Sequence, residues 1–252
     1  MSDKILVLIT GANQGLGYYA AQQLAATGNH HVLIGSRDVN KAHKAIETLA
    51  ADSSIKVSAS DFSALEIDVN SDSSIASAAK EVEQNYGKLD ILLNNAGVAQ
   101  AQEANPDGSG PSLREIYRAH YETNVFGASC VTEAFLPLLR KGHTKRLAFT
   151  SSGLASLALA STPDTLYAAN NYPIYRSTKS ALNMIMLGYA LGLEQEGFVV
   201  SAADPGYCAT NLNGNSGFKD PREGAKELVK SCVGAKEEVH GVMVSDDGVV
   251  PW

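Results

Sequence analysis

The chain of 252 residues contains little cysteine, no long apolar run and fewer basic than acidic residues. Its three cysteines, Cys130, Cys208 and Cys232, show neither CxxC nor Cys/His ligand spacing. Without a disulfide framework, this cysteine usage indicates a reducing compartment, and we expect a cytoplasmic protein. The only apolar run near the N-terminus covers residues 5–9, and no stretch reaches the ~18 apolar residues of a membrane span. No membrane segment is therefore expected.

The charge balance argues against nucleic acid as a partner. With 20 basic and 27 acidic residues the formal net charge is −7, so the overall field repels phosphate backbones. The six histidines are scattered, and the adjacent His30 and His31 open an expected strand, in which successive side chains point to opposite faces. No metal site is expected.

Short apolar segments alternate with longer helical patterns along the whole chain. The apolar segments lack strict alternation, which is typical of parallel strands covered on both faces. Strands are expected at residues 4–10, 31–35, 64–68, 90–94, 146–151, 198–203 and 241–245. Helices are expected at residues 18–27, 41–51, 73–86, 117–141, 175–196 and 221–233. The pattern predicts an α/β fold of βαβ units with a parallel sheet. The polar stretches 102–112 and 213–223 are expected to be loops, which leaves residues 1–252 as one domain.

A glycine-rich segment connects the first strand to the first helix. It runs Thr10-Gly11-Ala12-Asn13-Gln14-Gly15-Leu16-Gly17. Glycines permit a tight turn and close backbone approach, and a helix N-terminus presents free N–H groups and a positive dipole end to pyrophosphate. The spacing is Gly-x-x-x-Gly-x-Gly and not GxGxxG. Such glycines can form only a turn, but their position in the first βα unit favours a dinucleotide site.

The end of the second strand bears on the choice between NAD and NADP. Ser36 occupies the position where a carboxylate would bind the ribose 2′-hydroxyl of NAD, and Arg37 follows it. A guanidinium pairs with a 2′-phosphate, so NADP(H) is favoured. Alternatively, Arg37 caps a surface turn or pairs with Asp38. Asp68, at the end of the third strand, is placed to accept a hydrogen bond from the adenine amino group, or is a solvated strand-end residue.

Tyr175 and Lys179 form the clearest catalytic candidate. They stand four residues apart on one expected helix, so both side chains project from the same face. A free tyrosine has a pKa near ~10, and a nearby ammonium lowers it by typically ~1–3 units. We expect Lys179, with the cationic nicotinamide, to tune Tyr175 so that it protonates a carbonyl oxygen or accepts a proton from an alcohol.

Two further polar residues gain a role from this context. Ser152 ends the strand before the helix, where it can hydrogen-bond the substrate oxygen. Taken alone, Ser151 or Ser152 would be a helix or turn cap. Asn124 lies in mid-helix, and its functional interpretation is a helix kink that holds a water leading from Lys179 to solvent.

Together these motifs resemble the short-chain dehydrogenases/reductases, and among them the NADPH-dependent carbonyl reductases. The matching motifs cover nearly the whole chain and are residues 10–17, Asn94-Asn95-Ala96-Gly97, Asn124, Ser151-Ser152, Tyr175-x-x-x-Lys179, and Pro205-Gly206 with Thr210. The resemblance implies a doubly wound, seven-stranded, mostly parallel, Rossmann-like sheet. It also implies a small carbonyl or alcohol substrate and a homodimer or homotetramer.

The resemblance implies a catalytic tetrad, with Ser152 and not Ser151 carrying the catalytic hydroxyl, made of Asn124, Ser152, Tyr175 and Lys179. Residues 95–97 would line the adenosine side, residues 205–210 would hold the carboxamide end, and Lys179 would bind the nicotinamide ribose. The implied cofactor-binding residues are Gly11, Asn13, Gln14, Gly15, Leu16, Gly17, Ser36, Arg37, Asp68, Val69, Asn95, Ala96, Gly97, Tyr175, Lys179, Pro205, Gly206 and Thr210.

Two features depart from the family's pattern. Ser152 and Tyr175 are separated by 23 positions (175 − 152), longer than is usual, which places an insertion at residues 153–174 beside the substrate pocket. This insertion is expected to alter specificity or to disturb helix-mediated association. The segment after Thr210 is short, because a helix is expected from residue 221, so a large substrate lid is not expected.

The leading hypothesis is an NADPH-dependent oxidoreductase that reduces a ketone or aldehyde. An alternative of a different class is a non-catalytic NADP-binding module that senses redox state, although such a module has no need for the spacing of Tyr175 and Lys179. An epimerase or dehydratase of nucleotide sugars shares that pair, but needs a larger C-terminal lobe than the residues after Thr210 provide.

Overall fold

The computed structural model describes residues 4–99, 103, 105, 109–163, 165, 167–168 and 171–252. Parts of the predicted loop at 102–112 and of the insertion at 153–174 therefore lie outside the described residues.

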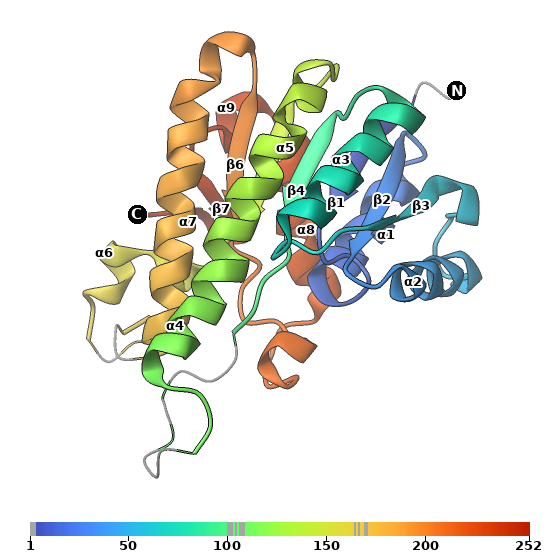
Figure 1. The fold of residues 1–252 in the computed structure, drawn as a ribbon. Coiled ribbons are helices and arrows are strands. Elements are labelled where there is room, and N and C mark those ends of the chain that lie inside the picture. The colour runs from blue at the N-terminus through green and yellow to red at the C-terminus, as the bar shows by residue number, and fades with distance from the viewer. Residues whose placement is uncertain are drawn as a thin grey trace.

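A sheet of eight strands runs through the centre of the fold (Figure 1). The strands are β1 Ile5–Ile9, β2 His30–Ser36, β3 Phe62–Glu66, β4 Ile91–Asn94, β5 Arg146–Thr150, β6 Val199–Ala203, β7 Met243–Ser245 and β8 Gly248–Val250. Their order is β3-β2-β1-β4-β5-β6-β7-β8, and β8 alone pairs antiparallel. This confirms the doubly wound, mostly parallel sheet and corrects the strand number from seven to eight. The added strand is only three residues long, too short for a hydrophobic pattern to reveal.

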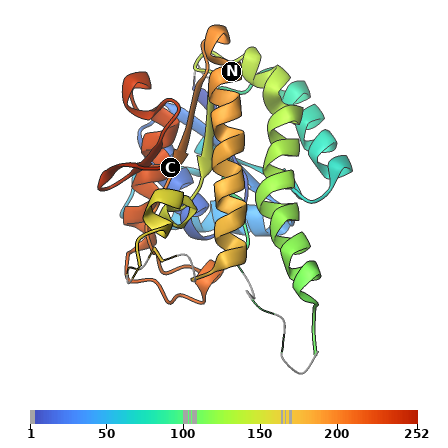
Figure 2. The same cartoon turned by 90° about the vertical axis from the view of Figure 1, so that its left-hand side faces the viewer.

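Helices cover both faces of this sheet. They are α1 Gly15–Ala26, α2 Val39–Ala51, α3 Asp72–Tyr86, α4 Leu113–Tyr121, α5 Ala128–Arg140, α6 Leu157–Ala160, α7 Pro173–Gly192, α8 Pro221–Val233 and α9 Lys236–Val239. Figures 1 and 2 show α3, α5 and α7 side by side on one face, with α1, α2 and α8 on the other.

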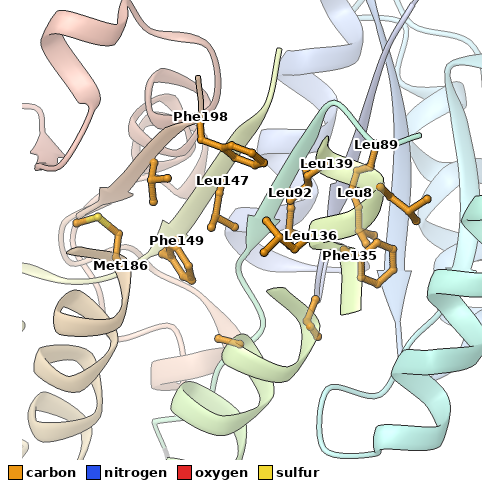
Figure 3. Packing of buried hydrophobic residues seen from close by; sticks show 14 of the residues in the cluster. Leu8, Leu89, Leu92, Phe135, Leu136, Leu139, Leu147, Phe149, Met186 and Phe198 are labelled. Carbon is orange, nitrogen blue, oxygen red and sulfur yellow. The ribbon is translucent and has the colours of Figure 1, made fainter. Parts of the chain in front are cut away.

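The first strand shows why apolar residues follow one another without alternation. Leu6 and Leu8 join the core beneath α3, α5 and α7, whereas Val7 and Ile9 join the core beneath α1, α2 and α8. Figure 3 shows the first of these cores, in which Leu8 shares the layer with Phe135 of α5. Burial on both faces requires apolar side chains at every position of such a strand.

The segment predicted as one helix over residues 117–141 is divided in two. A π-helical segment, Glu122–Gly127, joins α4 to α5, and it contains Asn124. Such π-helical interruptions are rare and occur frequently at functional sites. The position at which a kink was predicted, Asn124, thus lies within this π-helical segment.

The carboxyl ends of the parallel strands meet at one end of the molecule. At the lower end of Figure 1 they lie near α6, the start of α7 and the segment between β6 and α8. The strand order reverses between β1 and β4, and open α/β sheets bind their ligands in the crevice at such a switch point. The predicted site residues follow β1, β4, β5 and β6, so the topology brings them to this end.

Candidate active site

The glycine-rich segment takes the backbone conformation that its glycines permit. Gly11 and Gly15 have φ angles of 65° and 60°, in the left-handed region that residues with a side chain rarely adopt. The α1 helix begins at Gly15 without a side-chain cap from Gln14 and without an acidic residue in its first turn. Its first N–H groups and positive dipole end are therefore available to an anion.

The segment after β4 packs directly on this turn. A Cβ added at Gly17 would lie 2.5 Å from Asn95 Nδ2, and one added at Gly11 would lie 3.1 Å from Ala96 Cα. Thr10 Oγ1 accepts hydrogen bonds from the N–H groups of Asn95 and Ala96, both at 3.0 Å. Asn95 Nδ2 in turn donates to the Thr10 carbonyl at 2.8 Å. These contacts hold the turn after β1 against the segment after β4, at the point where the strand order reverses.

The loop after β6 closes the same end from the other side. Gly206 has a φ of 76°, and Thr210 is buried and lies 3.9 Å from where a Cβ of Gly15 would be. Asn211 Nδ2 donates to Gln14 Oε1 at 3.2 Å. Asn13 in the turn and Leu16 in the first turn of α1 are both half-buried. The glycine-rich turn and the loop after β6 thus contact each other at the carboxyl end of the sheet.

The end of β2 leaves a guanidinium exposed. Ser36 is buried, and Asp38 caps α2 by accepting the N–H of Asn40 at 3.0 Å. Within the described part of the chain, Arg37 forms no ion pair with Asp38 or any other carboxylate. The alternative of an Arg37–Asp38 pair is therefore wrong, because the Asp38 carboxylate serves the helix cap.

Asp68 and Val69 lie beyond the third strand and not at its last position. The strand β3 spans Phe62–Glu66, and the Asp68 carboxylate accepts the N–H of Asn70 at 3.0 Å in the turn that follows. The carbonyl of Val69 packs against the π-helical segment, 2.7 Å from where a Cβ of Gly127 would lie. Asp68 is half-buried at the carboxyl end of the sheet.

Asn124 connects the segment after β4 to α7. Its Oδ1 accepts the N–H of Val98 at 2.8 Å, and its Nδ2 donates to the Val98 carbonyl at 2.9 Å and to Thr178 Oγ1 at 3.0 Å. A Cβ added at Gly97 would lie 3.2 Å from Asn124 Oδ1 and 3.7 Å from Lys179 Nζ. Asn124 and Lys179 therefore border the same small space beside Gly97.

Lys179 is buried behind the candidate proton donor. Its Nζ donates to the Thr150 carbonyl at 2.7 Å and lies 5.8 Å from the centre of the Tyr175 ring. Burial lowers the pKa of Lys179 to about 8. The one carbonyl bond does not replace the lost hydration of a full charge.

The phenol of Tyr175 holds its proton more tightly in the chain alone than a free tyrosine does. Burial raises the pKa of its phenol, the charge of Asp204 raises it further, and a hydrogen bond with Ser152 partly offsets both. The acidifying effect expected of Lys179 together with the cationic nicotinamide stays a prediction, because in the chain alone removal from water and Asp204 dominate the pKa of the phenol. In this state the phenol holds its proton at neutral pH.

The two neighbouring serines have separate functions. Ser151 is buried, and its hydroxyl donates to Asn183 Oδ1 at 2.6 Å. Ser152 is half-buried, accepts the N–H of Leu154 at 3.2 Å and shares a hydrogen bond with Tyr175. Of these two serines, Ser152 is the one that interacts with the phenol, whereas the Ser151 hydroxyl is engaged by Asn183. Tyr175 and Lys179 of α7 are thus brought together with Ser152 after β5 and with Asn124 of the π-helical segment, from three separate segments.

The sequence pattern of the family described as short chain dehydrogenase matches residues 5–220. The chain belongs to this family. It is therefore an oxidoreductase of a family that binds a nicotinamide cofactor.

Relatives of known name are similar over nearly their full length. A short-chain dehydrogenase of Penicillium roqueforti, anuI, is 44% identical over 252 residues, which cover 98% of this chain and 96% of that protein. The short-chain dehydrogenase/reductase tropE of Talaromyces stipitatus is 33% identical, covering 94% of this chain and 89% of that protein. Among solved structures, an NADPH-bound carbonyl reductase from chicken fatty liver has a TM-score of 0.80 at 25% identity, covering 99% and 100% of the two chains.

Asp204 is a site residue that the sequence reasoning missed. Its carboxylate is buried and accepts hydrogen bonds from the N–H groups of Gly153 and Gly206, the latter at 3.0 Å. It therefore connects the segment after Ser152 to the turn after β6. The signal in the sequence was an acidic residue directly before Pro205 at the end of a buried strand.

The described part of the insertion packs beside these residues. The Arg176 guanidinium donates to the carbonyls of Tyr167, Ala168 and Asn171. Tyr172, directly before α7, has a φ of 53° and its side chain is exposed. The Arg176 side chain, next to Tyr175 in the sequence, therefore attaches the insertion to α7.

Other kinds of site find no support in the described residues. Across residues 4–99 and the later described ranges, no three His, Cys, Asp or Glu side chains come together in a way that could hold a metal ion. In the same part of the chain, none of the helices has the length and apolar character needed to cross a bilayer.

Proposed function

We propose that this short-chain dehydrogenase is an NADPH-dependent reductase of ketones or aldehydes in which Tyr175 donates the proton. The observation that carries the proposal is the placement of Lys179, whose Nζ is buried 5.8 Å from the centre of the Tyr175 ring, with the Ser152 hydroxyl close enough to interact with the phenol. A carbonyl oxygen lying against both hydroxyls receives a proton from Tyr175, and Ser152 stabilises the charge that develops on it.

The protonation states support the direction of reduction. Burial keeps the Tyr175 phenol protonated, which is the state that a proton donor requires. When a hydride adds to the carbonyl carbon, the electron pair of the C=O π bond takes the phenolic proton and leaves a phenolate. Lys179, with a pKa of about 8, is still mostly an ammonium at pH 7 and stabilises that phenolate.

The residues at the carboxyl end of the sheet have the chemistry to hold a nicotinamide dinucleotide. The backbone of Gly11 and Gly15 and the uncapped start of α1 would hold the pyrophosphate. Residues 95–97 and 205–210 would hold its two ends. When bound, the dinucleotide supplies the hydride of the reaction.

The preference for NADP rests on Ser36 and Arg37. A buried serine and an exposed guanidinium at the end of β2 suit a 2′-phosphate, which a carboxylate would repel. The similar chicken carbonyl reductase binds NADPH. A 3-ketoacyl-(acyl-carrier-protein) reductase from Brucella melitensis, complexed with NADH, shares the fold with a TM-score of 0.76 at 21% identity. Because both NADPH and NADH are bound by proteins of this fold, the proposed preference for NADPH depends on the side chains of Ser36 and Arg37.

The catalytic part of the proposal is tested with Tyr175→Phe. This variant is expected to bind NADPH as the wild type does and to lose at least ~100-fold in kcat for carbonyl reduction. Tyr189→Phe is the matched control, because Tyr189 lies on the same helix and donates to Glu133 at 2.6 Å. Cofactor binding by the wild type without turnover of any ketone or aldehyde would instead support the non-catalytic redox-sensing module.

The cofactor part of the proposal is tested with Arg37→Asp. The Kd for NADPH is expected to rise at least ~10-fold more than the Kd for NADH, because only NADPH loses an ion pair. Lys44→Asp, an equal charge change at an exposed site of α2, is the control. Equal weakening of both cofactors by Arg37→Asp would refute the NADP assignment.

A further inference from the structure

Four aromatic side chains form a wall at the same end of the molecule as Tyr175. The aromatic wall consists of Tyr172, Tyr207 and Phe218, which are linked by their mutual contacts, and of Tyr167, whose ring lies on Gly153. Tyr172 and Tyr207 are 48% and 39% exposed, and Phe218 is 78% exposed. Exposed aromatic side chains that gather at one place mark a binding site more often than scattered ones do.

Contacts between the rings join two segments that are distant in the sequence. The hydroxyls of Tyr172 and Tyr207 lie close enough to interact. The Tyr207 hydroxyl also bonds Ser216 Oγ at 2.6 Å, and its ring meets the edge of Phe218 with 5.8 Å between centres. The insertion and the loop after β6 are therefore held together by their aromatic side chains.

The wall lies beside both candidate catalytic hydroxyls. Tyr172 precedes Tyr175 by three residues at the start of α7. The ring of Tyr167 lies on Gly153, the residue after Ser152, with Cε1 only 2.7 Å from where a Cβ of Gly153 would be. A molecule whose oxygen reaches Tyr175 and Ser152 thus has aromatic rings next to the rest of its structure.

The same segments offer no free positive charge. The described residues of 167–176 and of 205–219 contain two basic side chains, Arg176 and Lys219. The first is bound by three backbone carbonyls, and the second pairs with Asp246 at 2.8 Å. Asp204, buried nearby, adds a negative charge. A carboxylate or phosphate placed against these segments would lose hydration without gaining a cation.

We propose that the substrate is a neutral aromatic aldehyde or ketone whose ring packs on the aromatic wall while its carbonyl oxygen lies at Tyr175 and Ser152. Ring-on-ring contacts contribute about 0.5–1.5 kcal/mol beyond the burial of apolar area, which favours an aromatic over a saturated ring of equal size. This inference rests on the proposed reductase function and names its substrate class.

The test compares matched aldehydes in steady-state kinetics with NADPH. Benzaldehyde and cyclohexanecarbaldehyde differ in the aromaticity of a ring of similar size. Methyl 4-formylbenzoate and 4-carboxybenzaldehyde differ in charge. The two variants of the aromatic wall are Phe218→Ala and Tyr207→Leu. The control is Leu191→Ala, because Leu191 is exposed and lies more than four helical turns beyond Tyr175 on α7.

The wall variants are expected to raise KM for benzaldehyde about 5–10-fold, with a much smaller change for cyclohexanecarbaldehyde and none in the control. The wild type is expected to prefer the methyl ester to the carboxylate by at least ~10-fold in kcat/KM. Equal KM changes for both rings, or a preference for the carboxylate, would overturn the inference while leaving the reductase function in place. No reduction of any aldehyde or ketone would overturn both.

Discussion

Lys179 is predicted to make the stability of the cofactor-free protein depend on pH. Burial lowers its pKa from the ordinary value of 10.5 to about 8. A difference of about 2.5 units (10.5 − 8), at about 1.36 kcal/mol per unit, corresponds to about 3 kcal/mol against folding while both states are protonated. This cost is fully present below the folded-state pKa of about 8. It is lost as the pH rises toward 10.5, because there the unfolded chain holds a proton that the folded chain has released.

The perturbation is Lys179→Met, which removes the charge at similar length. Between pH 7 and pH 10 the free energy of unfolding of the wild type is expected to rise by about 2.5 kcal/mol relative to that of the variant. The variant also loses the bond to the Thr150 carbonyl, but that loss lowers stability about equally at both pH values. Taking the difference between the proteins also removes the contributions of groups that both share.

The assay is urea unfolding followed by circular dichroism, without cofactor, at pH 7, 8.5 and 10. Lys80→Met, at an exposed position of α3, is the control and should follow the wild type at every pH. A constant stability difference between wild type and Lys179→Met across this range would refute the reasoning, because it would mean that the ammonium is no harder to hold in the folded chain than in the unfolded one.

Other substitutions test the cofactor side and the proton path. Gly17→Ala places a methyl group 2.5 Å from Asn95 Nδ2 and should cost about 1–3 kcal/mol in stability, seen as a lower Tm, with a weaker Kd for NADPH; wild-type values for both would contradict the close packing. Asp204→Asn puts an amide N–H group against backbone N–H donors and should lower kcat about tenfold. The alkaline limb of the pH profile of kcat should also move to lower pH, because the charge that raises the Tyr175 pKa is removed. An unchanged pH profile would contradict this effect of Asp204 on Tyr175. Ser152→Ala should lower kcat about 100-fold, whereas Ser151→Ala should cost about 1–3 kcal/mol in stability with little change in kcat; the reverse pattern would exchange their functions.

The fold was predictable because burial on both faces leaves a strong signal. In β1 every residue from Leu6 to Ile9 is buried, so the apolar run and the strand nearly coincide. The third strand was predicted two residues too late. Ile67 is buried and apolar like a strand residue, but Asp68 binds the N–H of Asn70 and starts a turn. A local hydrogen bond of this kind ends a strand without changing its hydrophobic pattern.

The parts of the site that depend on residues close together in the sequence were predictable. The parts that depend on contacts between distant segments were not. The spacing of Tyr175 and Lys179 on one helix could be read directly from the sequence. The direction of the shift in the Tyr175 pKa could not, because it depends on burial by other segments and on Asp204 from β6. The partners of Asn124, which are Val98 and Thr178, likewise come from separate elements.

The π-helical segment fixes how α4 and α5 are turned relative to each other. Successive residues of an α-helix are about 100° apart around its axis, so adding or removing one residue in Glu122–Gly127 would rotate one helix by that angle against the other. The apolar stripe of α4 would then leave α7, or the Asn124 amide would leave Val98. The number of residues in Glu122–Gly127 therefore matters more than which residues occupy its exposed positions. In a scan of single-residue deletions, this segment should tolerate deletion less well than α4 or α5.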